Sequence, residues 1–133
     1  MGVLDGKVAV VTGSARGIGR ATAELLAEQG ARVLINDLDG DVAEQAAEEI
    51  DGATVAFAGD LTHPGVPEEM IKRVVDEWGR LDIVVNNAGV MLLGPIEDAP
   101  TEEWERMIDL NLKGLLYVTR AAVRKSRSDQ YRR

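Results

Sequence analysis

Short apolar segments alternate with longer amphipathic segments along most of this 133-residue chain. The apolar segments have the length and β-branched content of strands, and the first is apolar almost throughout, as expected of a strand buried on both faces. The longer segments carry apolar residues at helical spacing. We expect strands at residues 7–12, 32–36, 54–58 and 81–86, and helices at residues 16–29, 40–50, 66–78 and 101–123.

This alternation constrains the fold class. Strands separated by helices pair in parallel, through right-handed crossovers. The sequence therefore predicts one α/β domain with a doubly wound parallel sheet, ending after about four strands and four helices. Residues 88–100 are expected to form a loop, and Thr101 is the expected N-cap of the last helix. The fourth strand would be an unpaired apolar edge, so we expect the isolated chain to self-associate.

Composition excludes several classes of protein. The net charge of −8 argues against a simple electrostatic nucleic-acid binder. The absence of cysteine excludes a disulfide scaffold and a thiolate metal site, and the lone His63 is expected to be a loop residue, so no metal site is expected. No apolar run approaches the roughly 20 residues of a membrane span, and the first ten residues lack a secretory signal pattern. We expect a cytoplasmic protein that binds neither nucleic acid nor membranes.

Basic residues are concentrated at the end of the chain. Residues 124–133 contain no apolar residue except Tyr131, and the composition changes abruptly after Val123. We therefore divide the chain into a domain of residues 1–123 and a basic polar tail of residues 124–133. A solvated tail or an out-of-frame reading explains this segment better than a basic arm for an acidic partner, because ten residues cannot overcome the acidic body.

The most informative segment is residues 12–19, with the sequence TGSARGIG, which joins the first strand to the first helix. At such a turn, glycine lets backbone N–H groups approach a pyrophosphate, and the helix N-terminus adds unpaired donors and a positive dipole end. Gly13 would allow the tight turn, Gly17 the close approach and Gly19 the packing of helix on strand. The alternative is an ordinary glycine-rich turn.

An acidic residue follows the second strand. Asp37 lies where a dinucleotide-binding fold places a carboxylate that accepts hydrogen bonds from the adenosine ribose. This carboxylate would repel a 2′-phosphate, so it favours NAD over NADP, whereas Arg16 could pair with that phosphate and favours NADP. We give more weight to Asp37. Alternatively, Asp37 only begins an acid-rich loop.

Two further polar segments follow the other expected strands. Residues 60–61 (DL) come after the third strand, and residues 86–89 (NNAG) come after the fourth. Ligands bind at the carboxyl ends of the strands in open α/β sheets, so these segments are candidates for a binding site. Each segment taken singly is also a plausible turn.

One more motif, D-L-N-L-K-G, stands at residues 109–114. In their order and spacing, this motif and the segments above resemble the short-chain dehydrogenase/reductase family over about residues 5–123. The resemblance implies a Rossmann-type fold that binds NAD(P)(H) and transfers hydride to or from a small alcohol or carbonyl substrate. It implies that Asn87 ties the central strands together and that Asn111 is the catalytic asparagine, which kinks its helix and holds a water in the proton relay. The implied cofactor-binding residues are Gly13, Ser14, Arg16, Gly17, Ile18, Gly19, Asp37, Asp60, Leu61, Asn86, Ala88 and Gly89.

The chain departs from the family pattern in its catalytic groups. The family uses a tyrosine with a lysine four residues later, and a serine on the preceding strand. Here Ala121 stands four residues after Tyr117, only two residues follow Tyr131, and no serine ends an apolar strand. We therefore expect an oxidoreductase of this lineage that uses NAD but lacks the catalytic Ser, Tyr and Lys. The alternative is a non-catalytic dinucleotide-binding module, or a truncated or frameshifted product.

Overall fold

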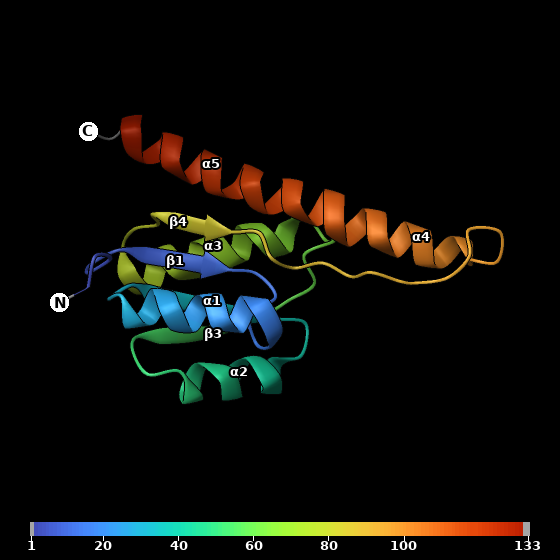
Figure 1. Ribbon diagram of the computed structural model, residues 1–133. Coiled ribbons are helices and arrows are strands. Elements are labelled where there is room, and N and C mark those ends of the chain that lie inside the picture. Colours follow the sequence, from blue (N-terminus) through green and yellow to red (C-terminus); the bar gives the residue numbers. More distant parts are fainter. Residues whose placement is uncertain (1, 132–133) are drawn as a thin grey trace.

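The computed structural model describes residues 2–131, with side chains described as far as Arg127. A parallel four-stranded sheet has the strand order β3-β2-β1-β4. Figure 1 shows helices wound around this sheet, which confirms the predicted doubly wound α/β class. The strands are β1 (Val8–Val11), β2 (Arg32–Asp37), β3 (Thr54–Ala58) and β4 (Ile83–Val85). The helices are α1 (Gly17–Glu28), α2 (Gly40–Glu49), α3 (Gly65–Trp78), α4 (Thr101–Ile108) and α5 (Leu115–Tyr131), with the π-helical segment η1 (Asp109–Gly114) between the last two.

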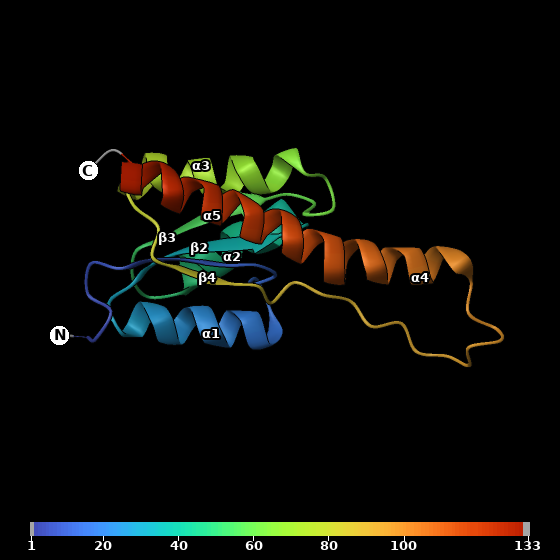
Figure 2. The same cartoon turned by 90° about the horizontal axis from the view of Figure 1, so that it is seen from above.

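Two apolar layers cover the sheet, one on each face. In Figure 2, α1 lies on one side of the sheet and α3 and α5 lie together on the other. Successive side chains of β1 enter these layers in turn: Ala9 and Val11 join the layer of α1 and α2, and Val8 and Val10 join that of α3 and α5. All four are fully buried, as the apolar run predicts.

Strand β4 lies at an edge of the sheet. Within the described residues its one ladder partner is β1, and its side chains are only half-buried. The start of this pairing is anchored by Asp82, whose carboxylate accepts from the Val8 N–H at 2.9 Å and from Arg80 at 2.7 Å. The hydrogen bonds from Arg80 hold the pKa of Asp82 below its usual range. The sequence-based expectation of an apolar edge strand is thus confirmed.

The final helical region has a different N-cap from the predicted one, and it contains a segment of another helix type. The N-cap is Pro100, without a side-chain capping bond, so the assignment of Thr101 as N-cap is wrong. The fixed φ of proline already sets the entry into the helix, and the acidic residues Glu102 and Glu103 in the first turn complement the helix dipole. The helix also contains the π-helical segment η1, which the spacing of apolar residues does not reveal.

The same helical region also ends later than predicted. It continues to Tyr131 and does not end near Val123. Arginine, lysine and glutamine are good helix formers, so a polar composition does not stop a helix. Arg124 also donates to Glu68 of α3 at 3.2 Å. The division at residue 123 stays a prediction; Arg132 and Arg133 lie outside the described residues.

Residues 86–100 form a long irregular connection from β4 to α4, as expected for residues 88–100 (Figure 2). Its apolar side chains at Met91, Leu93 and Ile96 are largely exposed. Across the described part of the chain, no helix has both the length and the apolar character to cross a bilayer.

Candidate functional site

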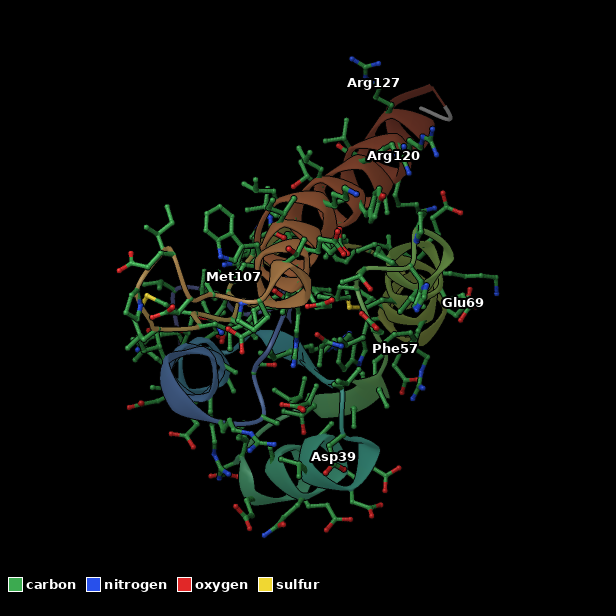
Figure 3. The ribbon with its side chains drawn as sticks, turned by 90° about the vertical axis from the view of Figure 1, so that its right-hand side faces the viewer. Asp39, Phe57, Glu69, Met107, Arg120 and Arg127 are labelled. Carbon is green, nitrogen blue, oxygen red and sulfur yellow. The ribbon has the colours of Figure 1, made fainter. Side chains whose placement is uncertain are left out.

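The carboxyl ends of the four strands border one large cavity. Its volume is about 980 Å³, within the range of small-molecule sites. Figure 3 looks onto this side of the molecule, with α4 and the loop that precedes it on one side and α2 on the other. The predicted site residues that line the cavity are Gly13, Arg16, Ile18, Asp37, Asp60, Leu61, Ala88 and Gly89.

The turn from β1 into α1 presents free backbone donors beside this cavity. Gly13 and Gly17 have φ angles of 61° and 63°, which L side chains rarely adopt. Helix α1 begins at Gly17, and its N-cap Arg16 makes no side-chain capping bond within the described residues. The first N–H groups of α1 therefore have no helical partner and no cap. A Cβ at Gly17 would meet no atom within 4 Å, so the space beside this turn is open.

A threonine hydroxyl fastens this turn to the end of β4. Thr12 is 1% exposed, and its Oγ1 accepts from the N–H groups of Asn87 at 3.0 Å and Ala88 at 2.9 Å. The Asn87 side-chain amide donates in return to the carbonyls of Thr12 and Gly13, at 3.2 and 3.1 Å. Asn87 thus ties the neighbouring strand ends together, as the resemblance implies.

A second group of hydrogen bonds fastens the turn to β2. The buried Asn36 accepts from the Gly13 N–H at 3.2 Å through its side chain. The Ser14 hydroxyl donates to the Val11 carbonyl at 2.6 Å and accepts from the Asn36 N–H at 3.0 Å. Ser14 is fully buried, and these bonds hold the loop in position from its core side. Asn36 was not among the predicted site residues; its one signal is a polar residue directly after the apolar run at residues 33–35.

Gly19 has no room for a side chain. A Cβ there would overlap the side-chain amide of Asn87 and the carbonyl of Gly13. Helix α1 therefore packs directly against the turn and against the end of β4. The predicted role of Gly19 in close packing matches this geometry.

Asp37 ends β2 at the cavity wall. Its side chain is 14% exposed, and one oxygen accepts from the Asp39 N–H at 3.0 Å. The other oxygen lies 3.9 Å from Nε of Arg16, whose side chain is 70% exposed. Asp37, which favours NAD, thus lies against Arg16, which could favour NADP. Their long separation and the exposure of Arg16 make this a weak ion pair.

Asp60 is held in its own loop after β3. Its Oδ1 accepts from the N–H of Thr62 at 3.0 Å and from its hydroxyl at 2.7 Å. These bonds, followed by the charges of His63 and Arg106, lower the pKa of Asp60. His63 lies in this loop, as expected, 3.7 Å from Asp60 and largely exposed. The neighbouring Leu61 is buried and contributes apolar lining.

Asn111 lies in η1 and holds the loop after β4. Its Oδ1 accepts from the Val90 N–H and its Nδ2 donates to the Val90 carbonyl, both at 2.8 Å. A Cβ at Gly89 would lie 3.1 Å from this Oδ1, so the loop and the helix are in close contact. This pair of bonds gives Asn111 a positioning role for the segment that carries Ala88 and Gly89.

Five of the predicted site residues do not line the cavity: Ser14, Gly17, Gly19, Asn86 and Asn111. Asn86 is exposed and donates to the Thr119 hydroxyl of α5 at 3.2 Å. Tyr117 of α5 is outside the lining, and the Arg120 guanidinium carbon lies 5.4 Å from its ring centroid. One wall of the cavity is not apparent from the sequence, because only the folded chain brings α4 and η1 over the strand ends. That wall consists of Glu102, Glu105, Arg106, Asp109 and Leu110.

The Thr12 hydroxyl offers a direct test of this geometry. Thr12→Val keeps the shape of the side chain but leaves the Ala88 N–H without its acceptor and the Asn87 N–H with only the Val85 carbonyl, at 3.1 Å. We expect a loss of about 2 kcal/mol in the free energy of unfolding, measured by urea denaturation. Thr12→Ser retains the hydroxyl and should lose clearly less. Equal stability of the two variants would show that the hydroxyl does not fasten the turn.

Comparison with known proteins identifies the family. The model of the short chain dehydrogenase family matches residues 7–130. A sorbitol dehydrogenase of Cereibacter sphaeroides is 42% identical over 121 residues, which are 91% of this chain and 47% of that protein. An uncharacterized oxidoreductase of Staphylococcus aureus strain MRSA252 is 42% identical over 124 residues, 92% of this chain and 54% of that protein.

The fold comparison agrees with the sequence comparison. A mutant short-chain dehydrogenase/reductase of Serratia marcescens superimposes with a TM-score of 0.85 at 34% identity, covering 91% of this chain and 51% of that structure. The chain thus spans about half the length of the relatives that it matches. With the family match extending from β1 into α5, the chain belongs to the short-chain dehydrogenase family.

Proposed function

We propose that the cavity binds NAD(H), and that the chain comes from an oxidoreductase transferring hydride between NAD(H) and an alcohol or carbonyl substrate. The observation that carries this proposal is the uncapped N-terminus of α1 beside a cavity that the Asp37 carboxylate also lines. Free N–H groups at a helix N-terminus bind phosphate, and a carboxylate accepts from ribose hydroxyls. A single dinucleotide bound in the cavity would place its phosphates at the N–H groups and its ribose at the carboxylate.

The residues present fit a dinucleotide. The space beside Gly17 is open, so a pyrophosphate can approach the N–H groups of Gly17, Ile18 and Gly19. Leu61 and Asp60 lie on the side proposed for adenine. Ala88 and Gly89, with Asn86 next to them, are on the side proposed for the adenosine and the nicotinamide. The bound nicotinamide supplies the hydride chemistry, and the protein supplies binding and orientation.

We propose NAD as the cofactor in preference to NADP. The Asp37 carboxylate lies at the end of β2 and would repel a 2′-phosphate on the ribose that it binds. Arg16 opposes this preference, but its exposed side chain already lies against Asp37. NADP is therefore the less favoured cofactor.

Catalysis is the part of the proposal that this chain does not carry alone. Asn111 has the family's position, and its proposed part in the proton relay complements its contact with Val90. A tyrosine followed four residues later by lysine does not occur in this sequence. This observation favours a second candidate function, a dinucleotide-binding module without catalysis. A cytoplasmic location belongs to this proposal and rests on composition alone.

Gly17→Val tests the phosphate-binding turn. We expect NAD affinity, measured by calorimetric titration, to fall at least about tenfold, because the side chain fills the approach to the N–H groups. Gly79→Val is the matched control: Gly79 also has a positive φ of 76° and open space around it, but it ends α3 away from the cavity. Unchanged NAD binding by folded Gly17→Val would refute the assignment.

Asp37→Ser tests the cofactor preference. Removing the carboxylate should weaken NAD binding about tenfold and narrow the difference in dissociation constant between NAD and NADP. Asp51→Ser, in the loop that precedes β3 at the opposite end of the sheet, is the control for a lost charge. If the two cofactors keep their relative affinities in Asp37→Ser, another residue sets the preference.

The missing catalytic groups give a prediction about turnover. The pure 133-residue protein should bind NAD and yet show no dehydrogenase activity, because no tyrosine–lysine pair is present to transfer the substrate proton. The assay follows NADH absorbance with sorbitol and other alcohols. Steady NADH production by the pure chain would contradict this expectation and would exclude the non-catalytic module.

A further inference from the structure

We propose that Arg106 of α4 recognises the adenine base of the bound nucleotide, with the flat face of its guanidinium stacked on the ring. The inference rests on the proposed function, because it requires a nucleotide in the cavity. It adds a residue that distinguishes the base from the other parts of that nucleotide. Arg106 belongs to none of the motifs that predict the site.

Arg106 lies near the part of the cavity proposed for adenine. Helix α4 lies beyond the carboxyl ends of the strands (Figure 1), and Arg106 lines the same cavity as Asp60 and Leu61. After the hydrogen bonds from Thr62 and the charge of His63, the charge of Arg106 also lowers the pKa of Asp60. The guanidinium is therefore within electrostatic range of the loop that follows β3.

Leu110 provides an apolar surface in the same part of the cavity. It stands four residues after Arg106, on the same side of the helical region, and it also lines the cavity. It packs in the same apolar layer as the buried Leu61. A Cβ at Gly114 would lie 3.6 Å from both Leu61 Cβ and Leu110 Cδ1, so the two leucines adjoin. An apolar surface beside a guanidinium suits a flat, uncharged base.

The Arg106 side chain is open to a ligand. The residue is exposed, and no described side chain forms a hydrogen bond or ion pair with it. Glu102 stands four residues earlier on α4, at the spacing of a helical ion pair, and yet the two do not pair. Arg16, which also lines the cavity, lies 3.9 Å from Asp37. A ligand can therefore engage Arg106 without first displacing a carboxylate.

The charges around Arg106 favour a base over a phosphate. Glu102, Glu105 and Asp109 line the cavity beside it. Lys113 pairs with Asp109 at 3.2 Å, and the two glutamates still outnumber the one guanidinium. Such an acidic wall repels a phosphate. A neutral adenine ring is not repelled, and its π face attracts a guanidinium.

The first test measures nucleotide affinity by calorimetric titration. Arg106→Ala should weaken binding of NAD, NADP and AMP by the same factor, about tenfold, because all three contain adenine. Arg106→Lys keeps the charge but has no flat face, so it should also bind them more weakly than the wild type. Arg32→Ala is the matched control: it removes an exposed arginine at the start of β2, at the opposite end of the sheet, and should change none of the affinities.

The Nε–H proton of Arg106 gives a second test by nuclear magnetic resonance. Its resonance is assigned by its absence from the spectrum of Arg106→Ala. A proton above an aromatic ring is shielded, so AMP should move this resonance upfield, whereas a hydrogen bond to phosphate would move it downfield. Ribose 5-phosphate, which lacks the base, should leave it in place.

Four results would overturn the proposal. They are unchanged NAD affinity in Arg106→Ala, a loss of affinity confined to NADP, wild-type affinity in Arg106→Lys, and a downfield shift with AMP. In each of these cases the wild-type protein still binds NAD, and the proposed function stands. Failure of the wild-type protein to bind NAD would instead refute the proposed function and the role of Arg106 together.

Discussion

The site depends on the hydrogen bonds that fasten the turn between β1 and α1. Thr12 joins this turn to the end of β4, and Asn36 joins it to the end of β2. The buried hydroxyl and amide groups replace the ladder bonds that are lost where the strands separate. Because the turn is fixed from both sides, the uncapped N-terminus of α1 keeps one orientation toward the cavity. Binding of a phosphate would then require little rearrangement.

The sequence predicts the fold well because its signals are local. Each strand is a short apolar run, and each helix has a regular apolar face, so order and class follow from the pairing rules for parallel strands. The errors occur in the last helix, where Pro100 and not Thr101 is the N-cap and the helix passes Val123. A capping residue depends on the path of the preceding loop, and a polar composition does not determine where a helix ends.

The candidate site could be predicted only in part. Gly13, Asp37 and Ala88 carry positional signals, since they follow strands whose ends must lie together. The roles of Ser14 and Asn36 depend on which side of the loop is buried, and the wall containing Arg106 depends on how α4 folds back. The sequence contains no period or motif for these contacts. The motif at residues 109–114 implies a kink at Asn111, but the π-helical form of this kink shows only in the backbone.

Binding of NAD at the strand ends is the central claim, and amide chemical-shift mapping with NAD⁺ tests it most directly. The account predicts the largest shifts at Gly13, Gly17 and Ile18, with further shifts at Leu61 and Gly89, which also line the cavity. Little change is expected in α3, which covers one face of the sheet together with α5. Shifts confined to α3 and α5, or none at saturating NAD⁺, would contradict the account.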